Sequence, residues 1–500
     1  MKENRTLKAL TRQWGYYIVL YMKNVAAIVL AAGRGTRMKS KLPKVLHPVS
    51  GRPMIFYPVR ALKELKVERT VVVVGHDSEQ VRRALPDKHI SFCEQSPQLG
   101  TGHAVMCAMP LLAGQDDPGG EVLILSGDVP LITKNTLRAL LRIHRRSTKG
   151  VKGRAVEAPV ISFISVLMDD PAGYGRVVRD RGGRVSAIVE DKDLAPSQQG
   201  ICEVNTGIYL IDFAFLKANL KKLGTKNKQK EYYLPDLISL ACAQGKRVKA
   251  FTHLDPEEVM GVNNRLELAR AGMFMRERIN EEHMMAGVSF IDPSTAYIDY
   301  GVKIGADAAI YTNVHLSGAT TVGAGSVIEE GVRIRDSRVG KGSVIKSHSV
   351  VESSVLADDV QAGPFARLRP GARLGRGARI GNFVEVKNAT LGQGVKAGHL
   401  SYLGDAVIGK DVNIGAGTII CNYDGVNKHK THIKDNVFVG SDTQLVSPVT
   451  IGKGAYIGSG STITKSVPPG ALALSRSEQR VIKGWAAKRS KMVSRKKTEG

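Results

Sequence analysis

The chain has 500 residues, of which 43% are hydrophobic. A chain of this length usually divides between two or more hydrophobic cores, so at least two domains are expected. The net charge of +26 comes without a DNA-binding motif or a basic stripe studded with aromatic residues, so it favours phosphorylated small molecules as partners over nucleic acid. The five cysteines show no Cys-x-x-Cys or zinc-finger spacing, which favours a cytoplasmic location and argues against structural zinc.

Residues 1–22 are interpreted as an N-terminal extension without a predicted role, and Met22 is itself a plausible translation start. The apolar run over 25–32 is too short to span a membrane and leads directly into a glycine-rich turn. We therefore expect a buried strand there and no membrane insertion.

Residues 23–265 alternate short apolar runs with helical patterns. Strands are predicted over 25–30, 70–74 and 121–125, and helices over 54–65 and 102–112. Apolar strands separated by helices predict an α/β, Rossmann-like domain with a largely parallel sheet. Ligands are expected at the carboxyl ends of its strands, where Gly33 and Asp128 lie.

The period of the hydrophobic pattern changes after a predicted linker helix over 266–287. From 288 to 470 aliphatic residues recur every six positions and are often followed by glycine, as in Ile304-Gly305 and Ile457-Gly458. Hexapeptide repeats predict a left-handed parallel β-helix, with the aliphatic side chains inside and small residues at tight corners. Residues 471–500 form a basic C-terminal arm, and disorder is expected beyond Ser490.

A glycine-rich turn, Gly33-x-Gly35, follows the first predicted strand and precedes Arg37 and Lys44. Its backbone N–H groups could bind phosphate oxygens while the two cationic side chains neutralise a triphosphate. The turn lacks the Gly-Lys-Ser/Thr of a Walker A loop and the third glycine of a dinucleotide-binding fingerprint. Alone, it is also compatible with a simple tight turn.

Further motifs carry a family resemblance. GxGTRM over 33–38 with LPK over 42–44 resembles the signature of sugar-1-phosphate nucleotidyltransferases. The later motifs follow the order of a bifunctional family, the N-acetylglucosamine-1-phosphate uridyltransferases that are also glucosamine-1-phosphate acetyltransferases. These motifs are Gln95, GTGHA over 100–104, SGDVP over 126–130, DPAGYGR over 170–176, IVE over 188–190, VNTG over 204–207 and GVNN over 261–264. The resemblance extends from Met22 to Trp485.

The resemblance implies synthesis of UDP-N-acetylglucosamine, a precursor of peptidoglycan and lipopolysaccharide. Glucosamine 1-phosphate would be N-acetylated with acetyl-CoA, and UTP would then transfer a uridylyl group to N-acetylglucosamine 1-phosphate with release of pyrophosphate. Displacement at phosphorus requires alignment and neutralisation of charge, for which Mg²⁺ and cationic side chains are suited.

The resemblance also assigns roles in the uridyltransferase half. Asp128 and Asn263 would hold Mg²⁺, and Arg37 and Lys44 would clamp the phosphates. Uracil would be read by Gln95, Gly100 and Thr101, and the sugar would be held by Gly175, Glu190 and Asn205. Other nucleotide-binding positions would be Leu30, Ala31, Ala32, Gly33 and Ser126. Ser126 departs from the tyrosine of some relatives, which affects the expected contact with ribose or base.

The repeat pattern is interrupted by two polar segments, 398–405 and 421–425. Histidine exchanges protons near neutral pH, so His399 is a candidate base for acetyl transfer to an amine. KAGHLSYLGD over 396–405 resembles the acetyltransferase site of the family, as does VNIGAGTIICNYDG over 412–425. The resemblance implies sugar-phosphate contacts from Arg369 and Lys387, glucosamine contacts from Tyr402 and Asn413, an oxyanion donor at the Ala416 N–H, and an acetyl-CoA groove lined by Asn422, Tyr423, Ser441, Ser459 and Arg476.

Ser459 departs from the alanine found in some relatives. The family resemblance also implies a homotrimer with the acetyl site between subunits. Two alternatives remain: a monofunctional nucleotidyltransferase whose β-helix only assembles it, and a non-catalytic scaffold. The polar segments between His399 and Tyr423 argue against the first, and Arg37, Lys44, Asp128 and Asn263 argue against the second.

Overall fold

The protein is described by a computed structural model that covers residues 24–33, 35–75, 78–112, 120–146 and 157–498, with only the backbone described at 491 and 493–498. The predicted extension over 1–22 lies outside these residues. The chain forms two compact units, Met1–Arg278 and Ile279–Gly500. Their boundary falls inside helix α9 (Arg265–Met285), which occupies the segment predicted as a linker helix.

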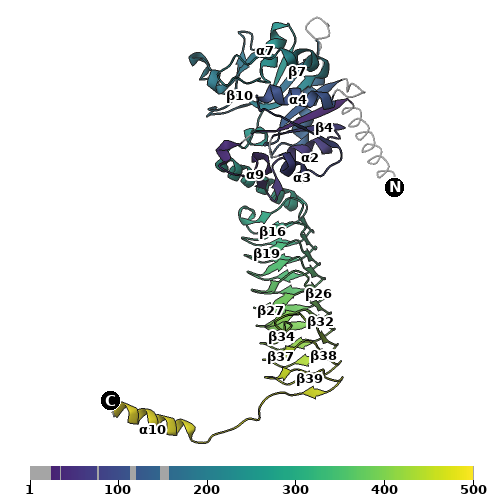
Figure 1. Ribbon diagram of the computed structural model, residues 1–500, viewed down its shortest axis with the longest axis vertical. Helices are drawn as coiled ribbons and strands as arrows, with labels where there is room; N and C mark the ends of the chain where they lie inside the picture. Colours follow the sequence, from purple (N-terminus) through teal and green to yellow (C-terminus); the bar gives the residue numbers. More distant parts are fainter. Residues whose placement is uncertain (1–23, 34, 76–77, 113–119, 147–156, 499–500) are drawn as a thin grey trace, which may run out of the picture. The chain divides into compact units, whose positions relative to one another are not determined.

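The first unit is built on a mixed β-sheet (Figure 1). Its central strands, in spatial order, are β11 (Val248–His253), β7 (Ile161–Leu167), β10 (Glu203–Asp212), β6 (Glu121–Ser126), β1 (Val25–Ala31), β4 (Arg69–Val74) and β5 (Ile90–Glu94). Strand β1 pairs in parallel with β4 and β6, whereas β10 runs antiparallel to both of its neighbours. Strands β8 (Arg176–Arg179) and β9 (Val185–Val189) extend the sheet beside β10.

Helices cover both faces of this sheet, as the apolar strands predict. The helices are α2 (Phe56–Glu64), α3 (Ser78–Ala84), α4 (Thr101–Leu112), α5 (Lys134–Arg145), α6 (Phe213–Asn219), α7 (Asp236–Ala243) and α8 (Pro256–Val259). Alternate residues of β1 enter different cores: Ala27 and Val29 join one buried cluster, while Ala26 and Ile28 join the other. The strands and helices expected in chain order are confirmed, and a strand buried on both faces explains the continuous apolar run.

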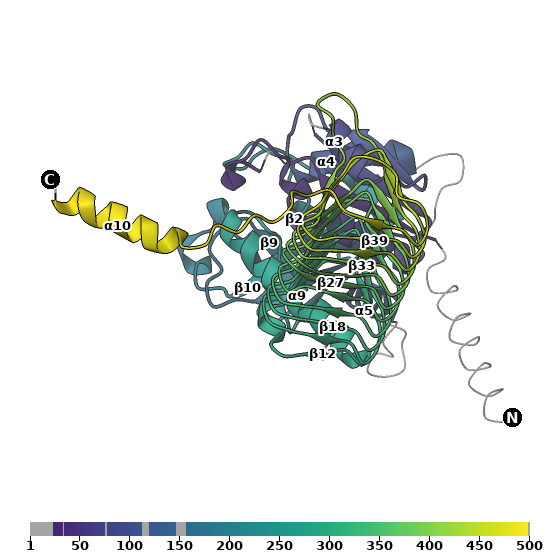
Figure 2. The same cartoon turned by 90° about the horizontal axis from the view of Figure 1, so that it is seen from below.

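The second unit is a parallel β-helix whose described strands stack into three sheets (Figure 2). The sheets run from β12 (Ser289–Phe290) to β41 (Leu472–Ala473), from β13 (Tyr297–Ile298) to β40 (Thr462–Ile463), and from β14 (Lys303–Ile304) to β38 (Val449–Ile451). Ile310 pairs with Ile328, which pairs with Ile345, so one coil takes 18 or 17 residues. Three hexapeptides make a coil, and the buried aliphatic residues fill its interior.

The glycine that follows many of these aliphatic residues has a different role from the predicted tight corner. A Cβ on Gly305 would lie 2.5 Å from the backbone nitrogen of Ala324 in the next coil, and one on Gly323 would lie 2.5 Å from that of Lys341. These glycines therefore permit close stacking of successive coils. The left-handed corner positions are other residues, such as Asp307 and Gly325, with φ of 60° and 67°.

Two segments leave the regular coil. Ile408 of β32 (Ala406–Ile408) pairs with Ile433 of β35 (Thr431–Ile433), so the intervening 422–430 segment is excluded as a loop. The C-terminal arm forms helix α10 (Trp485–Thr498), so the expected disorder beyond Ser490 is wrong. Its sequence is rich in Ala, Lys, Arg and Met, which favour helix, and contains no proline. Within the described residues, no helix is both long and apolar enough to cross a membrane.

Candidate active sites

The predicted nucleotide residues lie around one cavity of about 630 Å³ at the carboxyl ends of β1 and β6. Backbone direction explains this convergence, because parallel strands end at the same edge of a sheet. The wall includes Leu30, Ala31, Ala32, Gly33, Lys44, Gln95, Gly100, Thr101, Ser126 and Asp128. The positions predicted to contact the nucleotide or its base are therefore brought together, except Arg37, which lines a second cavity.

A second cavity of about 230 Å³ brings together the residues predicted to hold the sugar. Its wall includes Arg37, Gly175, Glu190, Asn205 and Asn263. Leu30, Thr101, Ser126 and Asp128 line both cavities, so the two share a wall at the end of β6. This is the place where the phosphates of two substrates could approach each other.

Charged and amide side chains converge at this shared wall. The Lys44 ammonium forms an ion pair with Asp128 and donates to Asn263 Oδ1 over 3.1 Å. Arg37 also donates to Asn263 Oδ1 over 3.0 Å, and the Ser126 hydroxyl donates to Asp128 Oδ1 over 2.6 Å. The Lys44 ammonium thus lies between Asp128 and Asn263, the two predicted metal ligands.

The donor chemistry at this wall fits Mg²⁺. A carboxylate and an amide oxygen are hard ligands, and Mg²⁺ usually keeps several waters or phosphate oxygens in its remaining positions. Among the described residues no group of three or more His, Cys, Asp and Glu side chains could hold a metal ion. The described residues therefore offer Asp128 and Asn263 for a metal shared with substrate, and no closed protein cage.

Backbone contacts bring Asp128 and Asn263 together although they lie far apart in the sequence. The Val262 N–H donates to the Asp128 carbonyl over 2.9 Å. A Cβ on Gly261 would lie 3.1 Å from Asp128 Oδ1, so glycine allows the two segments this close approach. The Asn263 amide group donates to Glu267 Oε2 over 3.3 Å, which leaves Oδ1 facing the cations.

Gln95 is oriented from within the protein. Its Nε2 donates to the Gly100 carbonyl over 2.9 Å and lies 3.2 Å from His103 Nδ1. Since both contacts occupy the amide nitrogen, the carboxamide oxygen is the atom left for a ligand. An oxygen acceptor suits the N–H of a uracil ring, which agrees with the base-reading role predicted for Gln95.

The sugar cavity is electrostatically distinctive. Burial first, and then the neighbouring carboxylates led by Asp236, together raise the pKa of Glu190 to about 7. Asn205 donates from Nδ2 to the Tyr209 hydroxyl over 2.6 Å, which holds the amide in one orientation. The cavity therefore presents one fixed amide and one carboxyl group that can change protonation near neutral pH.

His399 lies at the end of β30 (Lys396–His399) and pairs with Asn382 on the preceding coil. The two side chains also meet, with His399 Nδ1 2.5 Å from Asn382 Oδ1. An amide oxygen can only accept, so Nδ1 carries the proton and Nε2 is left as the basic nitrogen. This arrangement suits the predicted proton acceptor.

A basic cluster lies on neighbouring coils. Arg369 donates to Glu385 over 2.7 Å, and Glu385 pairs in register with Tyr402. The neighbouring Lys428 ammonium holds the pKa of Lys387 below its usual value, with Arg369 contributing in the same direction. Repulsion between these cations would be relieved by a phosphate dianion.

Other predicted acetyl-site residues follow the coils in order. Asn413 pairs with Lys396 of β30, next to the strand end that carries His399. Gly415 and Gly440 pack closely against Ser441 and Ser459 of the following coils, which aligns Ala416, Ser441 and Ser459 along one edge. Arg476 donates to the Ser459 carbonyl over 2.9 Å and so joins the same line.

Asn422 and Tyr423 begin the excluded loop and have internal partners. The buried Asn422 amide donates to Asp405, which also accepts from Asn388. The Tyr423 hydroxyl donates to the Gly425 carbonyl over 2.5 Å. The Asn422 side chain therefore holds the loop in place. Only the Asn422 backbone and the exposed Tyr423 ring are left to line the predicted acetyl-CoA groove.

Comparison with known proteins covers both units. The family described as MobA-like NTP transferase domain matches residues 27–158, and the bacterial transferase hexapeptide family (six repeats) matches residues 430–465. A protein named "Bifunctional protein GlmU" from Pelobacter propionicus is 49% identical over 471 residues, which cover 94% of this chain and 100% of that protein. Proteins of the same name from Geotalea daltonii and Geobacter sulfurreducens are 50% and 46% identical over 93% of the chain, and 100% and 98% of their own lengths are covered.

The chain belongs to the bifunctional GlmU family. This confirms the family resemblance and the α/β nucleotidyltransferase domain followed by a left-handed β-helix of hexapeptide repeats. It also confirms a bifunctional transferase with uridyltransferase and acetyltransferase activities in UDP-N-acetylglucosamine synthesis. Nothing favours the monofunctional alternative.

Sequence reasoning missed several residues that this GlmU-family structure places beside the predicted ones. These are His103, Glu267, Asn382, Glu385, Asp405 and Lys428. His103 belongs to the quoted GTGHA motif and could have been found there. Asp405 likewise ends the quoted KAGHLSYLGD motif, and Glu267 lies four residues after its partner Asn263. For Asn382, Glu385 and Lys428, only the register of the coils and the position of the excluded loop reveal the partners.

Proposed function

We propose that residues 23–265 transfer the uridylyl group from UTP to N-acetylglucosamine 1-phosphate, and that residues 288–470 with the arm over 471–500 acetylate glucosamine 1-phosphate from acetyl-CoA. The observation that carries the proposal is the convergence of Arg37, Lys44, Asp128 and Asn263 where two cavities share a wall. The activities belong to the family, and the assignment of residues and cofactors to them is proposed.

In the uridyltransferase site, Asp128 and Asn263 would hold Mg²⁺, which when bound neutralises charge on the phosphate oxygens. Lys44 then leaves its ion pair with Asp128 and joins Arg37 on the phosphates of UTP. The glycine turn at Gly33 supplies backbone N–H groups to the same oxygens. Attack by the sugar phosphate oxygen on the α-phosphorus forms a P–O bond as pyrophosphate leaves, so these residues act by alignment and charge neutralisation.

The nucleotide and sugar occupy separate cavities in this proposal. Gln95 accepts the uracil N–H through its free oxygen, supported by Gly100 and Thr101. Glu190 and Asn205 hold hydroxyl or amide groups of N-acetylglucosamine 1-phosphate beside Gly175. The shared wall at Asp128 brings the acceptor phosphate towards the α-phosphate of UTP.

In the acetyltransferase site, His399 Nε2 takes a proton from the amine of glucosamine 1-phosphate as the amine attacks the thioester carbonyl. Arg369 and Lys387 bind the sugar phosphate, with Tyr402 and Asn413 beside the sugar. The Ala416 N–H donates to the oxyanion that forms before CoA leaves as the thiol. The edge formed by Ser441, Ser459 and Arg476, together with Tyr423, contacts acetyl-CoA.

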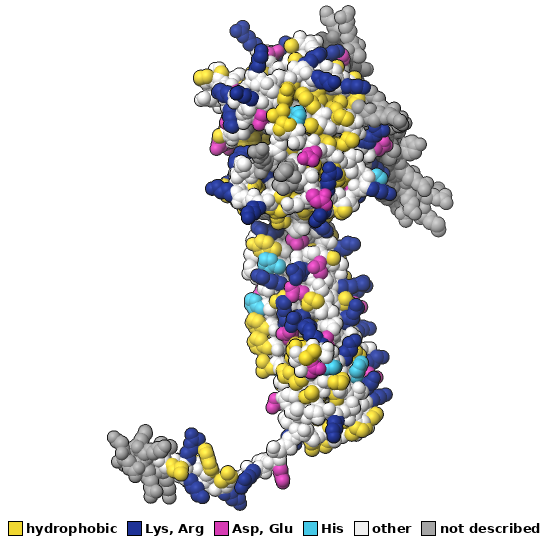
Figure 3. Space-filling view, viewed as in Figure 1, with side chains coloured by type: hydrophobic (Ala, Val, Ile, Leu, Met, Phe, Trp, Pro, Cys, Tyr) yellow, Lys and Arg dark blue, Asp and Glu magenta, His cyan; other side chains and the backbone are white. Residues whose placement is uncertain are grey.

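Oligomerisation through the hexapeptide repeats is expected of the family, and we propose a homotrimer. Exposed hydrophobic side chains gather along an edge of the β-helix (Figure 3). His348, Phe365, Phe383 and Leu400 take equivalent positions on successive coils, with φ between 49° and 58°. The centroid of the Phe365 ring lies 5.3 Å from that of His348 and 5.4 Å from that of Phe383. Even so, Phe383 and Leu400 remain 57% and 60% exposed.

The row formed by His348, Phe365, Phe383 and Leu400, called the ladder below, supports assembly at the acetyl site. Positive φ is rare for bulky residues, so a row of them on the surface is a costly arrangement that a subunit interface would explain. Leu400 directly follows His399, so a neighbouring subunit that packs on the ladder would also wall the acetyl site. Three-fold closure suits a prism with flat sides.

Two variants with opposite expected effects test the proposal. Asp128→Ala should abolish pyrophosphate release from UTP and N-acetylglucosamine 1-phosphate but leave CoA release unchanged. His399→Ala should lower CoA release about 100-fold or more and leave pyrophosphate release unchanged. EDTA should act as Asp128→Ala does. Equal loss of both activities in either variant would contradict the assignment of residues to two separate sites.

A further inference from the structure

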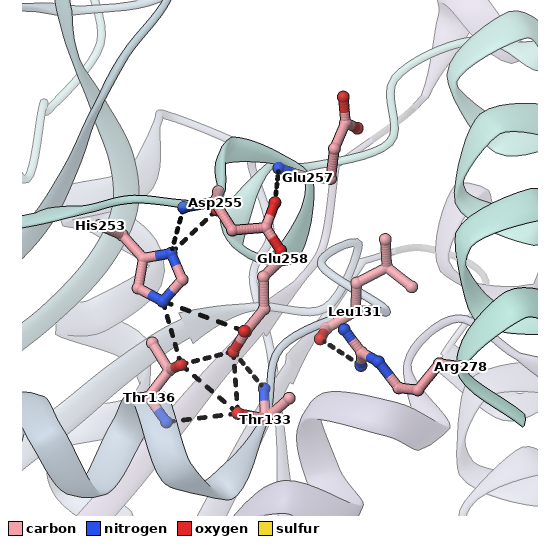
Figure 4. Close-up of polar contacts among 8 residues, drawn as sticks. All are labelled: Leu131, Thr133, Thr136, His253, Asp255, Glu257, Glu258 and Arg278. Atoms are coloured by element: carbon pink, nitrogen blue, oxygen red, sulfur yellow. Dashed lines mark hydrogen bonds and ion pairs between the residues drawn. The ribbon is translucent and has the colours of Figure 1, made fainter. Parts of the chain in front are cut away.

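Glu258 lies outside both cavities but is held by an unusual set of donors (Figure 4). Its side chain is 13% exposed. The Oε1 atom accepts from the Thr133 N–H over 3.1 Å, from the Thr133 hydroxyl over 2.8 Å and from the Thr136 hydroxyl over 2.5 Å. Helix α8 and the start of α5 are thereby tied through one carboxylate oxygen.

The contact places negative charge at a helix N-terminus. Thr133 is the N-cap of α5, and its hydroxyl accepts from the Thr136 N–H over 3.3 Å. A carboxylate there interacts favourably with the helix dipole and satisfies a backbone donor that the helix leaves free. The nearest cationic candidate, His253, has Nε2 3.9 Å from Glu258 Oε2 and 3.2 Å from the Thr136 hydroxyl. The carboxylate is therefore held mainly by hydroxyl and amide donors.

Two short segments connect this contact to the proposed metal ligands. One runs over 128–133 and carries Asp128 at its start; the other runs over 258–263 and carries Asn263 at its end. The Val262 N–H joins the segments near the ligands by donating to the Asp128 carbonyl over 2.9 Å. Glu258 and Thr133 join them at the opposite ends.

The segments have little freedom between these two points. Val129, Leu131, Val259 and Val262 are all buried. Arg278 of α9 additionally donates to the Leu131 carbonyl over 2.8 Å (Figure 4). The spacing of Asp128 from Asn263 therefore depends on both ends of the paired segments.

We propose that Glu258 is a positioning residue of the uridyltransferase: it fixes the separation and orientation of Asp128 and Asn263 and thereby sets the affinity for Mg²⁺. This inference rests on the proposed metal site. Loss of the contact frees one end of the paired segments, so the two oxygen ligands sample more arrangements than the nearly ideal octahedral geometry of Mg²⁺ accepts.

The test uses the full-length protein with Glu258→Ala, Glu258→Gln and the control Glu257→Gln. Glu257 is exposed and points away from Thr133 and Thr136. Two quantities are measured: Mn²⁺ binding in the presence of UTP without acceptor, followed by electron paramagnetic resonance, and the Mg²⁺ concentration that gives half-maximal pyrophosphate release. Acetyltransferase activity and circular dichroism report folding.

Glu258→Ala should weaken Mn²⁺ binding and raise the half-maximal Mg²⁺ concentration by about 10-fold or more, with kcat restored at high Mg²⁺. Glu258→Gln keeps an oxygen acceptor and should fall between the alanine variant and the wild type, while Glu257→Gln should match the wild type. A merely structural role would lower kcat at all Mg²⁺ concentrations without changing Mn²⁺ affinity, and that result would overturn the inference.

If Glu258→Ala fails to fold, Thr136→Val replaces it, because valine keeps the buried shape and removes the hydroxyl that contacts Glu258 and His253. It should shift metal affinity in the same direction by a smaller factor, and wild-type affinity would overturn the inference. Wild-type protein that binds no Mn²⁺ with UTP would instead contradict the proposed metal site itself, so the two failures are distinguishable.

Discussion

Glu190→Gln provides a quantitative test of the electrostatics of the sugar cavity. Burial and nearby carboxylates raise the pKa of Glu190 from 4.5 to about 7. A carboxyl group whose pKa is raised by folding stabilises the folded state fully below pH 4.5, and this contribution is lost as the pH rises through 7. Glutamine is neutral at every pH and avoids this loss.

The size of the effect follows from the displacement of the pKa. At about 1.4 kcal/mol for each pH unit, the wild type should lose up to about 3 kcal/mol at pH 8 and about 1 kcal/mol at pH 5.5. Residual solvent access to the carboxylate reduces both losses of stability. The loss at pH 8 should therefore exceed the loss at pH 5.5 by about 1–2 kcal/mol. Glu190→Gln should therefore stabilise the first unit, and more strongly at pH 8.

The assay is urea unfolding followed by circular dichroism at 222 nm, since most described helices lie in the first unit. Glu203→Gln is the matched control of opposite sign. Burial raises the pKa of Glu203, but hydrogen bonds from Arg179 and Ser165 outweigh it and hold the pKa below its usual value. The ionised Glu203 carboxylate stabilises the folded state above the usual pKa of a glutamate. Glu203→Gln should therefore lower the free energy of unfolding at pH 8. Equal stability of Glu190→Gln and wild type at pH 8 would refute the reasoning.

Three further variants address the β-helix. Asn382→Ala removes the acceptor for His399 Nδ1 and should lower the acetyl-transfer rate about 10-fold or more with a displaced pH profile; an unchanged profile would mean that Asn382 does not orient the ring. Phe383→Glu should dissociate the oligomer in light scattering and lower acetyl transfer alone, whereas an intact trimer would place the interface elsewhere. Gly323→Val should cost about 1–3 kcal/mol of unfolding free energy, because its Cβ meets the backbone of Lys341, and a neutral effect in denaturant titration would argue against tight coil stacking.

The fold was largely predictable because its patterns are local. Apolar runs separated by helical segments identify the α/β unit, and a period of six identifies the β-helix without any long-range information. The reason for the glycines was not predictable in the same way. Gly305 and Gly323 follow the hexapeptide pattern, but the backbone that approaches them closely belongs to a coil 17 or more residues later. The order of α10 was also missed, because composition alone does not separate a basic helix from a disordered tail.

The candidate sites were predictable to the extent that motifs mark them. Asp128, Asn263 and His399 lie in motifs, and the structure brings Asp128 and Asn263 together, although their roles stay predictions. Their supporting residues were not visible in the sequence. Asn382 acts through its contact with His399 on the next coil, and Glu267 accepts from the backbone and side chain of Asn263 and from the side chain of Asn264. Such contacts leave no periodic or compositional signal.

The sequence by itself determined the folds of the two units and the family. It also determined the positions at which polar motifs interrupt the apolar strands of the first unit and the hexapeptide repeats of the second. These depend on side-chain periodicity and on residues close together in the chain, which a sequence records directly. Only the tertiary structure decided which atoms face a ligand: Gln95 presents its oxygen because Gly100 accepts from its nitrogen, and Asp128 meets Asn263 because Val262 pairs with its backbone. Such orientations follow from contacts between distant segments, and these exist only after the chain has packed.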